Sequence, residues 1–527
     1  MLLQANTTSL FNVADLQLIA PELILTACAC VALVMEVILP YRKSKLTAYF
    51  SLVGVALAFV SLVLQWITMG PTLPFDGFYG MVRIDGFALL FKAIFLIAAA
   101  LAIGISTRYL DIEGEQHGEY YALVLFATVG MMFIACGYDL ISLYISLELM
   151  ALTFYVLVAF TKREKRSNEA AMKYFLLGAF SSGVLLYGMS LLFGIAGSTN
   201  LADIGAKINE LVPGVQNAIF NNSQPGAVYD ALAGMRPLML LAMIALGAGL
   251  FFKVAAVPFH MWAPDVYEGA PTSVTAFLST GSKAASFALY ARIFTEALGG
   301  MRADWAPLLG LVAAITIMVG NWAAVTQENS KRLLAYSSIS NAGYLLLGLV
   351  ANNLYGYIGL VVYLFVYTLM NMGAFGIIIS LRRRGIIGDN VDDLTGLGQK
   401  APLMAAMMSI FMLSLGGLPV TGGFIGKYFL FGGLIERGRV EQKTWYYVLA
   451  VWAIVNTVVS FYYYFRFIKV MYLGDRVADN RPLALSPALQ AALVVSVVGV
   501  LWIGVWPQPL VQVTRDLVLA TFGSLFG

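Results

Sequence analysis

The chain has 527 residues, of which 60% are hydrophobic and 12% are charged, whereas a soluble globular protein has roughly 45–50% and about 25%. With a mean hydropathy of +0.82, this composition excludes a soluble protein, because so few charged residues could not cover its surface. The formal net charge of +3 is small and scattered, which excludes a basic surface for nucleic acid.

Apolar runs of about 20 residues, the length that crosses a hydrocarbon core of ~30 Å, recur about fourteen times along the chain. We therefore predict an all-α, polytopic membrane protein with about fourteen transmembrane helices. The predicted spans are 17–39, 47–69, 84–106, 120–137, 139–161, 170–197, 237–259, 268–298, 305–326, 332–351, 354–381, 402–435, 445–472 and 485–506. No basic segment precedes the first run, so we expect a retained helix and no cleaved signal. The polar stretch 198–236 is expected to be a structured loop or a short surface helix.

Lysine and arginine gather in alternate connections, and such an excess marks the cytoplasmic side of a membrane protein. The connections after odd-numbered spans hold Arg42, Lys43, Lys45, Lys162, Arg163, Lys165, Arg166, Lys331, Arg332, Arg382, Arg383, Arg384, Lys469, Arg476 and Arg481. Those after even-numbered spans hold Arg83, Lys207, Arg302, Arg437, Arg439 and Lys443. Both termini are then expected outside the cytoplasm, in a bacterial-type inner membrane or an equivalent energy-transducing membrane.

Cysteine and histidine are too scarce to predict a redox or metal centre. Cys28, Cys30 and Cys136 all lie in apolar runs, and Cys28 and Cys30 are ~200° apart on a helix. His117 lies in a polar loop and His260 near a helix break, which is too few for buried bis-histidine haem. We therefore expect no metal, no electron carrier and no other cofactor in this chain.

Four ionisable residues lie deep within apolar runs, where a charge costs roughly 2.5–3.5 kcal/mol on insertion scales. They are Glu148, Lys253, Lys283 and Lys427. One glutamate cannot pair with three lysines, and an unpaired amine at low dielectric binds its proton less tightly than in water. Such an amine can take up and release protons, so the set is predicted to be a proton relay. The simpler alternative is that these charges only join helices as buried pairs.

Two of these lysines lie beside residues that break helices. Lys253 is followed by Pro258, and Lys427 follows Pro419 in the segment GGLPVTGG. A broken helix at membrane depth is tolerated where its backbone lines a cavity or pathway, so the seventh and twelfth helices are predicted to be broken. His260 is expected at a cavity mouth, either as a possible proton relay or as a structural histidine.

The order of the spans also predicts an internal repeat. Spans 4–8 and 9–13 contain five helices each, and an odd number places the second unit in the inverted orientation, as in many transporters. The predicted division is helices 1–3 in residues 1–119, a first repeat in 120–300, a second, inverted repeat in 301–475, and helix 14 with a tail in 476–527. Broken helix 7 then corresponds to broken helix 12, and Lys253 to Lys427, with one half-channel in each repeat.

Three long segments carry a family resemblance. They are FFKVAAVPFHMWAPDVYEGAPTSVTAFLSTGSKAASF (251–287), TQENSKRLLAYSSISNAGYLLLG (326–348) and SLGGLPVTGGFIGKYFLF (414–431). These segments resemble the antiporter-like membrane subunits of respiratory complex I, which are shared with multisubunit sodium/proton antiporters, and the likeness extends from about span 4 to span 13. The resemblance implies a fourteen-helix subunit with two inverted five-helix bundles, and Lys427 and the chain length favour the subunit type called N.

The resemblance also implies roles for the buried charges. Glu148 would pair with Lys253, Lys283 would connect the two bundles, and Lys427 would be the terminal group. One departure is Asn341 in SSISNAGY, where relatives often carry histidine. Because asparagine cannot titrate, the resemblance leaves open whether a protonatable side chain or water alone passes the proton at that point.

The implied activity is proton translocation coupled to quinone reduction elsewhere in a large complex. The implied partners are the lipid bilayer and the other membrane-arm subunits of complex I, including other antiporter-like subunits. NADH, FMN, iron–sulfur clusters and quinone would be bound by partner subunits and not by this chain. Two alternatives remain: a subunit of a multisubunit sodium/proton antiporter, and an inert structural subunit of the membrane arm.

Overall fold

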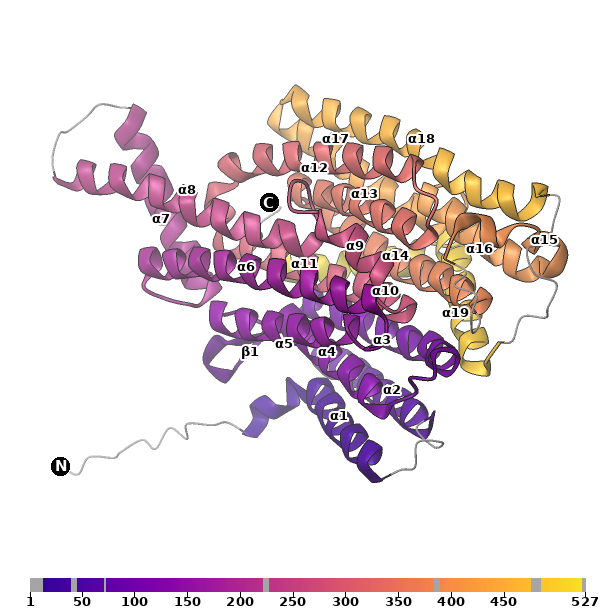
Figure 1. The fold of residues 1–527 in the computed structure, drawn as a ribbon. Coiled ribbons are helices and arrows are strands. Elements are labelled where there is room, and N and C mark those ends of the chain that lie inside the picture. Colours follow the sequence, from indigo (N-terminus) through magenta and orange to yellow (C-terminus); the bar gives the residue numbers. More distant parts are fainter. Residues whose placement is uncertain are drawn as a thin grey trace, which may run out of the picture.

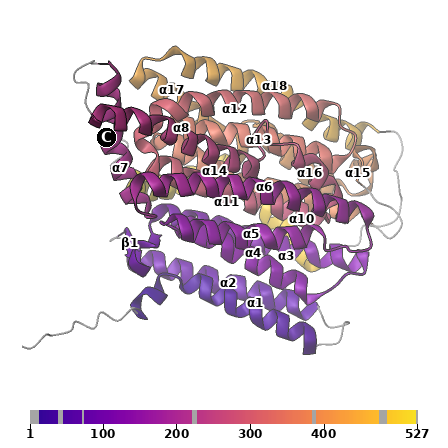
Figure 2. The ribbon, with the colours of Figure 1, turned by 60° about the vertical axis from the view of Figure 1, so that its left-hand side comes forward.

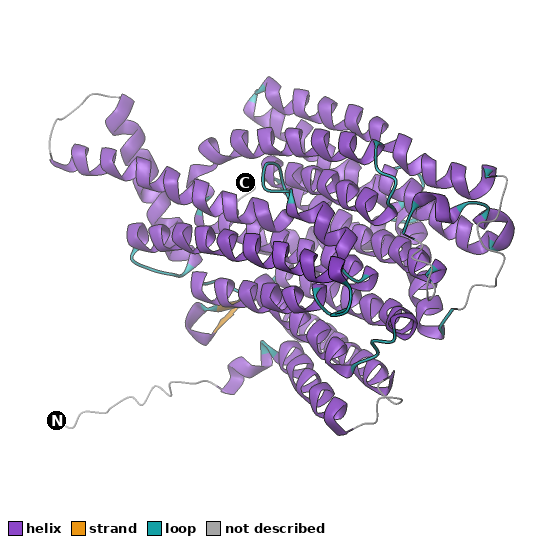
Figure 3. Cartoon of the chain, in the orientation of Figure 1, coloured by secondary structure: helices purple, strands orange, loops and turns teal. Residues whose placement is uncertain are grey.

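The computed structural model describes residues 13–38, 45–70, 73–220, 227–382, 389–474 and 485–523, and the side chains in these ranges except at 13–14 and 213–234. Nearly all of this part is helical (Figure 3), which confirms the all-α class. Six basic residues used to predict the orientation lie outside the described residues: Arg42, Lys43, Arg383, Arg384, Arg476 and Arg481.

The elements follow one another in the order shown in Figure 1. The N-terminal part contains η1 (Val13–Gln17), α1 (Ala20–Ile38), α2 (Lys45–Met69), the antiparallel strands β1 (Phe75–Gly77) and β2 (Val82–Ile84) joined by η4 (Phe78–Gly80), and α3 (Gly86–Glu113). Then come α4 (Gly118–Cys136), α5 (Leu140–Val158), α6 (Lys165–Ala196), α7 (Leu201–Phe220), α8 (Ala227–Val254), α9 (Trp262–Gly269), α10 (Thr272–Phe277), η5 (Leu278–Ser282), α11 (Lys283–Ala291) and η6 (Arg292–Ala297). The remainder contains η7 (Gly299–Met301), α12 (Arg302–Val325), α13 (Ser330–Ala351), α14 (Leu354–Leu381), η8 (Val391–Leu394), α15 (Leu397–Lys400), α16 (Pro402–Gly416), α17 (Gly422–Glu441), α18 (Thr444–Leu473), α19 (Pro487–Val505) and α20 (Gln508–Phe522).

The predicted spans correspond to observed helices, with differences at the eighth and the twelfth. In the described ranges, twelve helices are long and apolar enough to cross a membrane: α1 to α6, the part of α8 from residue 235, α12 with η7, α13, α14, α18 and α19. The predicted twelfth span is divided into α16 and α17. The predicted eighth span is a series of short segments, in which η5 and η6 are π-helical. The sequence did not predict these π-helical turns, because they have no breaker residue comparable to proline.

The polar stretch after α6 is helical over a greater length than the sequence suggested. It was expected to be a loop or a short surface helix, but α7 is a helix of 20 residues. The C-terminal tail likewise contains the helix α20, which composition did not reveal because its apolar run is short.

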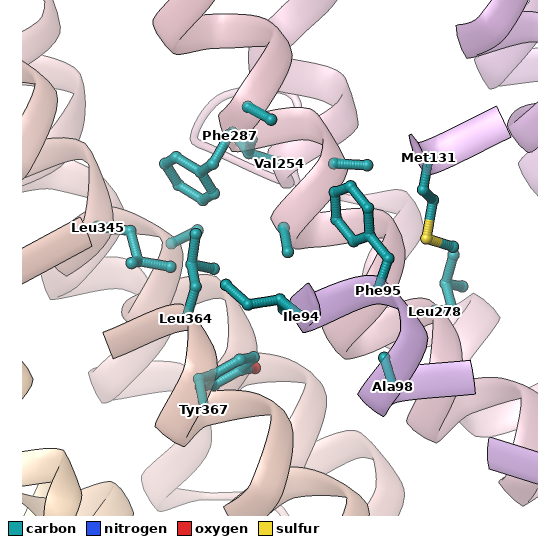
Figure 4. Packing of buried hydrophobic residues seen from close by; sticks show 14 of the residues in the cluster. Ile94, Phe95, Ala98, Met131, Val254, Leu278, Phe287, Leu345, Leu364 and Tyr367 are labelled. Carbon is teal, nitrogen blue, oxygen red and sulfur yellow. The ribbon is translucent and has the colours of Figure 1, made fainter. Parts of the chain in front are cut away.

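The helices form an elongated bundle whose core lies around α3, α13 and α14. Figure 2 shows α1 and α2 at one edge and α17 and α18 at the opposite edge. In the most apolar window of each helix, 83%, 94% and 89% of the residues of α3, α13 and α14 are buried, compared with 28% and 33% in α1 and α2. Figure 4 shows the centre of this core, where Ile94 and Phe95 of α3 lie in one cluster with Leu364 of α14 and Phe287 of α11.

The last two helices return to this core and join distant parts of the chain. α19 packs against α3, α14 and α17, and α20 packs against α3 and α14. The backbone nitrogen of Phe87 donates to Oγ1 of Thr521 at 3.0 Å. The ring of Phe522 lies 5.3 Å from that of Phe87 and 4.8 Å from that of Tyr357, measured between centroids. The C-terminal helix therefore packs against both α3 and the start of α14.

Ion pairs at the helix ends fall into two groups. On one side, Lys45 pairs with Asp111, Lys173 and Arg332 pair with Asp265, Arg332 pairs with Glu268, and Arg382 pairs with Glu113. On the other side, Arg236 pairs with Asp304 and Arg302 pairs with Glu441. Apart from Lys173, which lies within α6, every residue of the first group lies in or next to a connection that follows an odd-numbered span. Every pair in the second group joins connections that follow even-numbered spans. The helices therefore cross in alternation, and we call the side with Lys45, Lys173, Arg332 and Arg382 the basic face.

Close helix packing gives a test of the fold. A Cβ on Gly320 of α12 would lie 2.5 Å from the backbone nitrogen of Ser340 in α13, so Gly320→Ala must separate the two helices. We expect this substitution to cost about 1–3 kcal/mol of folding free energy, seen as a lower unfolding temperature in detergent. Gly183→Ala in α6 is the matched control, because no atom lies within 4 Å of its added Cβ. Equal unfolding temperatures for the two variants would contradict the packing of α12 on α13.

Candidate functional site

Two helices are broken at the positions that the sequence predicted. The turn between α8 and α9 contains Pro258, and the turn between α16 and α17 contains Pro419. Each turn also holds a non-glycine residue with positive φ, namely Ala255 (58°) and Val420 (72°). Left-handed backbone is unfavourable for such residues, above all for a β-branched one, and it persists only where the surrounding structure fixes it. Both breaks are therefore built features of the bundle.

Lys253 lies in the last turn of α8, directly before the first break. Its side chain is 8% exposed, and its Nζ donates to Oγ of Ser182 in α6 at 3.1 Å. Glu148 of α5 acts electrostatically on Lys253, but in the described structure no ion pair within 4.0 Å joins the two residues. Oε1 of Glu148 is buried and accepts no hydrogen bond from the described residues. The pair implied by the resemblance is thus separated in this structure.

Lys427 lies in the second turn of α17, directly after the second break. It is 3% exposed, and its Nζ donates to the carbonyl oxygens of Leu415 at 2.9 Å and Gly416 at 3.2 Å. These carbonyls end α16, where helix backbone lacks partners and carries partial negative charge. The ammonium also lies 4.7 Å from the ring centroid of Tyr344 in α13. Lys427 therefore satisfies the broken helix end without a carboxylate.

Lys283 lies between these two sites, at the junction of η5 and α11. It is 3% exposed, and its Nζ donates to the backbone oxygen of Ser338 in α13 at 2.5 Å. The ring of Tyr367 from α14 has its centroid 6.0 Å from this nitrogen. No described carboxylate pairs with Lys283 within 4.0 Å, so all three lysines are held by neutral oxygen atoms.

Buried hydroxyl and amide groups on α13 connect the surroundings of Lys283 with those of Lys427. Asn341 donates to Oγ of Ser337 at 3.4 Å and accepts from the hydroxyl of Tyr363 at 2.6 Å, and Ser337 shares a hydrogen bond of 2.5 Å with Tyr464. Ser337, Asn341 and Tyr344 follow each other at spacings of four and three, which places them on one face of α13. α13 therefore presents a continuous polar face between the two lysines, with Asn341 at its centre.

Lys253 and Lys427, which the span order pairs as equivalents, lie on opposite sides of their breaks. The two breaks correspond in order, but Lys253 precedes its break and Lys427 follows its own. Aligning Pro258 with Pro419 places Ser414 opposite Lys253. Sequence reasoning missed this because it compared only the presence of a lysine beside each proline.

His260 lies in the first break, as expected, and is half-buried, with an Nδ1 that accepts no hydrogen bond from the described residues. A pocket of about 240 Å³ lies beside it between α6, α8 and the break. Its neighbours Phe259 and Met261 line this pocket, but His260 does not. The structure therefore places His260 near a cavity and not at its wall.

The structure contains further buried charges that sequence reasoning missed. Glu22 of α1 and Lys92 of α3 form a fully buried ion pair with a distance of 2.6 Å. Asp85 accepts two hydrogen bonds from the buried guanidinium of Arg292, at 2.6 and 2.8 Å. Lys331, taken as a loop charge, is 2% exposed. Lys92 could have been found, because it lies inside the predicted span 84–106, but the others lie near span ends and their partners become evident only in three dimensions.

The three cysteines do not form a disulfide or a metal site in the described ranges. Cys28, Cys30 and Cys136 are free thiols, and Sγ of Cys136 lies 3.8 Å from Oε1 of Glu22. In the part of the chain that the structure covers, no three His, Cys, Asp or Glu side chains converge as metal ligands would.

Comparison with known proteins identifies relatives over nearly the full length. The family described as NADH:quinone oxidoreductase/Mrp antiporter, TM, matches residues 137–455. NADH-quinone oxidoreductase subunit N 2 of Solibacter usitatus is 47% identical, with 96% of this chain and 98% of the relative covered. The subunit N of Trichlorobacter lovleyi is 41% identical, with 97% and 99% covered.

Solved structures show the same fold. A chain of respiratory complex I from Thermus thermophilus with bound aureothin superimposes with a TM-score of 0.74 at 32% identity, covering 93% of this chain and 98% of that one. A chain of the Mrp complex from Dietzia sp. DQ12-45-1b superimposes with a TM-score of 0.79 at 18% identity, covering 98% and 100%. The second likeness shows a shared fold alone.

The ion pair between Glu22 and Lys92 gives a test that is independent of function. Glu22→Leu alone leaves a buried lysine without its partner, which should cost about 3–5 kcal/mol and lower the unfolding temperature in detergent. The double variant Glu22→Leu with Lys92→Met removes both charges and should recover most of that loss. A double variant as unstable as the single one would show that the pair does not carry the effect.

Proposed function

The chain belongs to the NADH:quinone oxidoreductase/Mrp antiporter transmembrane family, and we propose that it moves protons across the membrane as subunit N of an NADH-quinone oxidoreductase. Relatives with that name, 47% and 41% identical over nearly the whole chain, support this assignment. In the proposal, the chain lies in the membrane arm beside other antiporter-like subunits. NADH oxidation and quinone reduction, with FMN and iron–sulfur clusters, take place in partner subunits.

The observation that carries the proposal is the set of three buried lysines held only by neutral oxygens. A permanently charged amine in this environment would need a carboxylate, whereas an amine that alternates between charged and neutral forms does not. Lys253, Lys283 and Lys427 therefore suit proton uptake and release. The polar face of α13 supplies hydrogen-bonding groups between the last two.

Glu148 supplies the control in this mechanism. In the structure its carboxylate is separated from Lys253, which bonds to Ser182 instead. A carboxylate that closes to ~4 Å stabilises the charged lysine by up to ~4 kcal/mol at an effective dielectric of 20. Closing the pair draws a proton onto Lys253, and opening it drives the proton towards Lys283. Quinone chemistry in the complex would set which state is occupied.

Transfer from Lys283 towards Lys427 follows α13. The amide of Asn341 does not titrate, so the proton passes it through the hydroxyls of Ser337 and Tyr363 together with water. In this role Asn341 orients both hydroxyls through the bonds at 3.4 and 2.6 Å. His260, near the first break, is assigned as an accessory relay group.

The chain is divided into two channel-forming units, and its termini are assigned to one side of the membrane. Residues 120–300 and 301–475 act as two inverted five-helix units that each supply a half-channel, between the N-terminal helices (1–119) and the C-terminal part (476–527). The basic face is assigned to the cytoplasm, because lysine and arginine accumulate there. Both termini then lie on the non-cytoplasmic side of a bacterial-type inner membrane. An antiporter role is not favoured, because the Mrp chain shares 18% identity and therefore the fold alone.

Replacing a relay lysine tests the function. Lys253→Met in the assembled complex, reconstituted into liposomes, should lower quinone-coupled proton translocation roughly tenfold or more, because methionine fills the site but carries no proton. Lys207→Met is the matched control, since Lys207 is a half-buried surface residue of α7 paired with Glu210. Unchanged proton translocation per electron in Lys253→Met would rule out its role in the relay.

Reporter fusions test the sidedness. Alkaline phosphatase joined to the C-terminus should be active, because that enzyme matures outside the cytoplasm, whereas green fluorescent protein at the same place should stay dark. The opposite pattern is expected for fusions after Arg163, which lies on the basic face between α5 and α6. A fluorescent C-terminal fusion would place the C-terminus in the cytoplasm and contradict the assigned orientation.

A further inference from the structure

Lys331 is a buried amine to which the proposed relay assigns no role. Its Nζ donates to the backbone oxygen of Ala270 at 2.8 Å, and the side chain is 2% exposed. Asp389, Arg382, Glu268 and Glu113 act on it electrostatically. None of them forms an ion pair with it within 4.0 Å in the described structure, because Glu268 pairs with Arg332, and Glu113 and Asp389 pair with Arg382. Lys331 is therefore held by a neutral oxygen, as the three relay lysines are.

Lys331 occupies an unfavourable position for a permanent positive charge. Lys331 is the second residue of α13, and the N-terminus of a helix disfavours positive charge. Ser330 precedes Lys331, and Thr272 lies two residues after Ala270. The hydroxyls of both are buried and make no hydrogen bond within the described residues. Buried hydroxyls of this kind can bond to ordered water, which suits a junction that conducts protons.

α9 connects this junction with both the surface and Lys283. The carbonyl oxygen of Ala270, the residue that follows α9, accepts a hydrogen bond from Lys331. The hydroxyl of Tyr267 in α9 shares a hydrogen bond of 3.4 Å with Oγ of Ser338, the residue whose backbone oxygen holds Lys283. Ser338 lies seven residues, or about 10 Å, beyond Lys331 along α13. Thr275 donates to the carbonyl of Tyr267 at 3.0 Å.

A pocket beside α9 faces the basic face of the bundle. This polar pocket of about 210 Å³ is lined by the charged side chains of Arg166, Glu169, Lys173, Asp265 and Glu268, and also by Gly269, the residue before Ala270. The side chains of Asp265 and Glu268 are 37% and 29% exposed. Lys173 pairs with Glu169 and Asp265, and Arg332 pairs with Asp265 and Glu268, so ionised groups that water can reach lie directly beside Ala270.

We propose that Lys331 is a proton-carrying residue that feeds Lys283 from the basic face, which rests on the function proposed above. A proton arriving at the pocket of Glu169, Asp265 and Glu268 binds Nζ of Lys331. It then leaves that nitrogen through the hydroxyls of Tyr267 and Ser338 with water, and binds Nζ of Lys283. Each step breaks one bond to hydrogen and forms another, with no change in oxidation state.

Lys331→Arg separates proton transfer from structural support. Arginine keeps the positive charge and can donate to the oxygen of Ala270, but it does not release its proton in a protein. In the assembled complex reconstituted into liposomes, Lys331→Arg should assemble normally on a native gel and translocate protons roughly tenfold more slowly or worse. Lys207→Arg is the matched control on a surface lysine outside the proposed relay. Wild-type translocation by Lys331→Arg would overturn the proposal, because it would show that charge and a donor suffice.

Lys331→Gln and Lys283→Met separate a failure to assemble, and a failure of the whole relay, from a failure of the role proposed for Lys331. If the larger arginine prevents assembly, Lys331→Gln decides, because glutamine is smaller, keeps a hydrogen-bond donor and does not titrate. Wild-type translocation by that variant would also overturn the proposal. Lys283→Met distinguishes this inference from the proposed function. If Lys283→Met stops translocation and Lys331→Arg does not, the relay stands and the role of Lys331 is wrong. If neither variant has an effect, the relay itself is wrong.

Discussion

A backbone inside hydrocarbon has to satisfy its own hydrogen bonds, and this constraint governs the whole molecule. Unbroken helices meet it automatically, whereas the turns after α8 and α16 need partners from elsewhere. At the first break, the indole of Trp262 donates to the carbonyl of Phe252 and Thr316 accepts from the nitrogen of Val257. At the second, Lys427 donates to the end of α16. The side chains that bond to the free backbone groups at the breaks therefore determine where polar and charged residues lie at membrane depth.

Much of the fold was predictable because the bilayer imposes a length on apolar runs. The positions of most spans, the breaks at Pro258 and Pro419, and the family and its subunit type were predicted from the sequence and are confirmed. The π-helical segments η5 and η6 were not, because an altered turn leaves the apolar pattern unchanged. The same holds for the position of Lys427 relative to its break, which depends on where the helix restarts and not on the proline alone.

The candidate site was only partly predictable. Composition identifies a lysine inside an apolar run, and Lys253, Lys283 and Lys427 were found in that way and are indeed buried. Near a span end, the sequence does not distinguish a lysine in water from one folded under a neighbouring helix. Lys331 belongs to the second kind because α9 covers the start of α13. Likewise, Asn341 appears from the sequence as the loss of a titratable group, whereas the structure shows it ordering two hydroxyls.

The contact between Phe87 and Thr521 also constrains how the protein is made. These residues are 434 positions apart, and a ribosome that adds roughly 5–20 residues per second needs about 20–90 s to cover that interval. During this time α3, one of the most buried helices, faces lipid where α14, α19 and α20 will later pack. Helix insertion and final packing are therefore separate events. The N-terminal helices wait in the membrane without their partners until the last helix is inserted. Packing of α20 on α3 is then intrinsically slow, because the two helices are so distant in sequence.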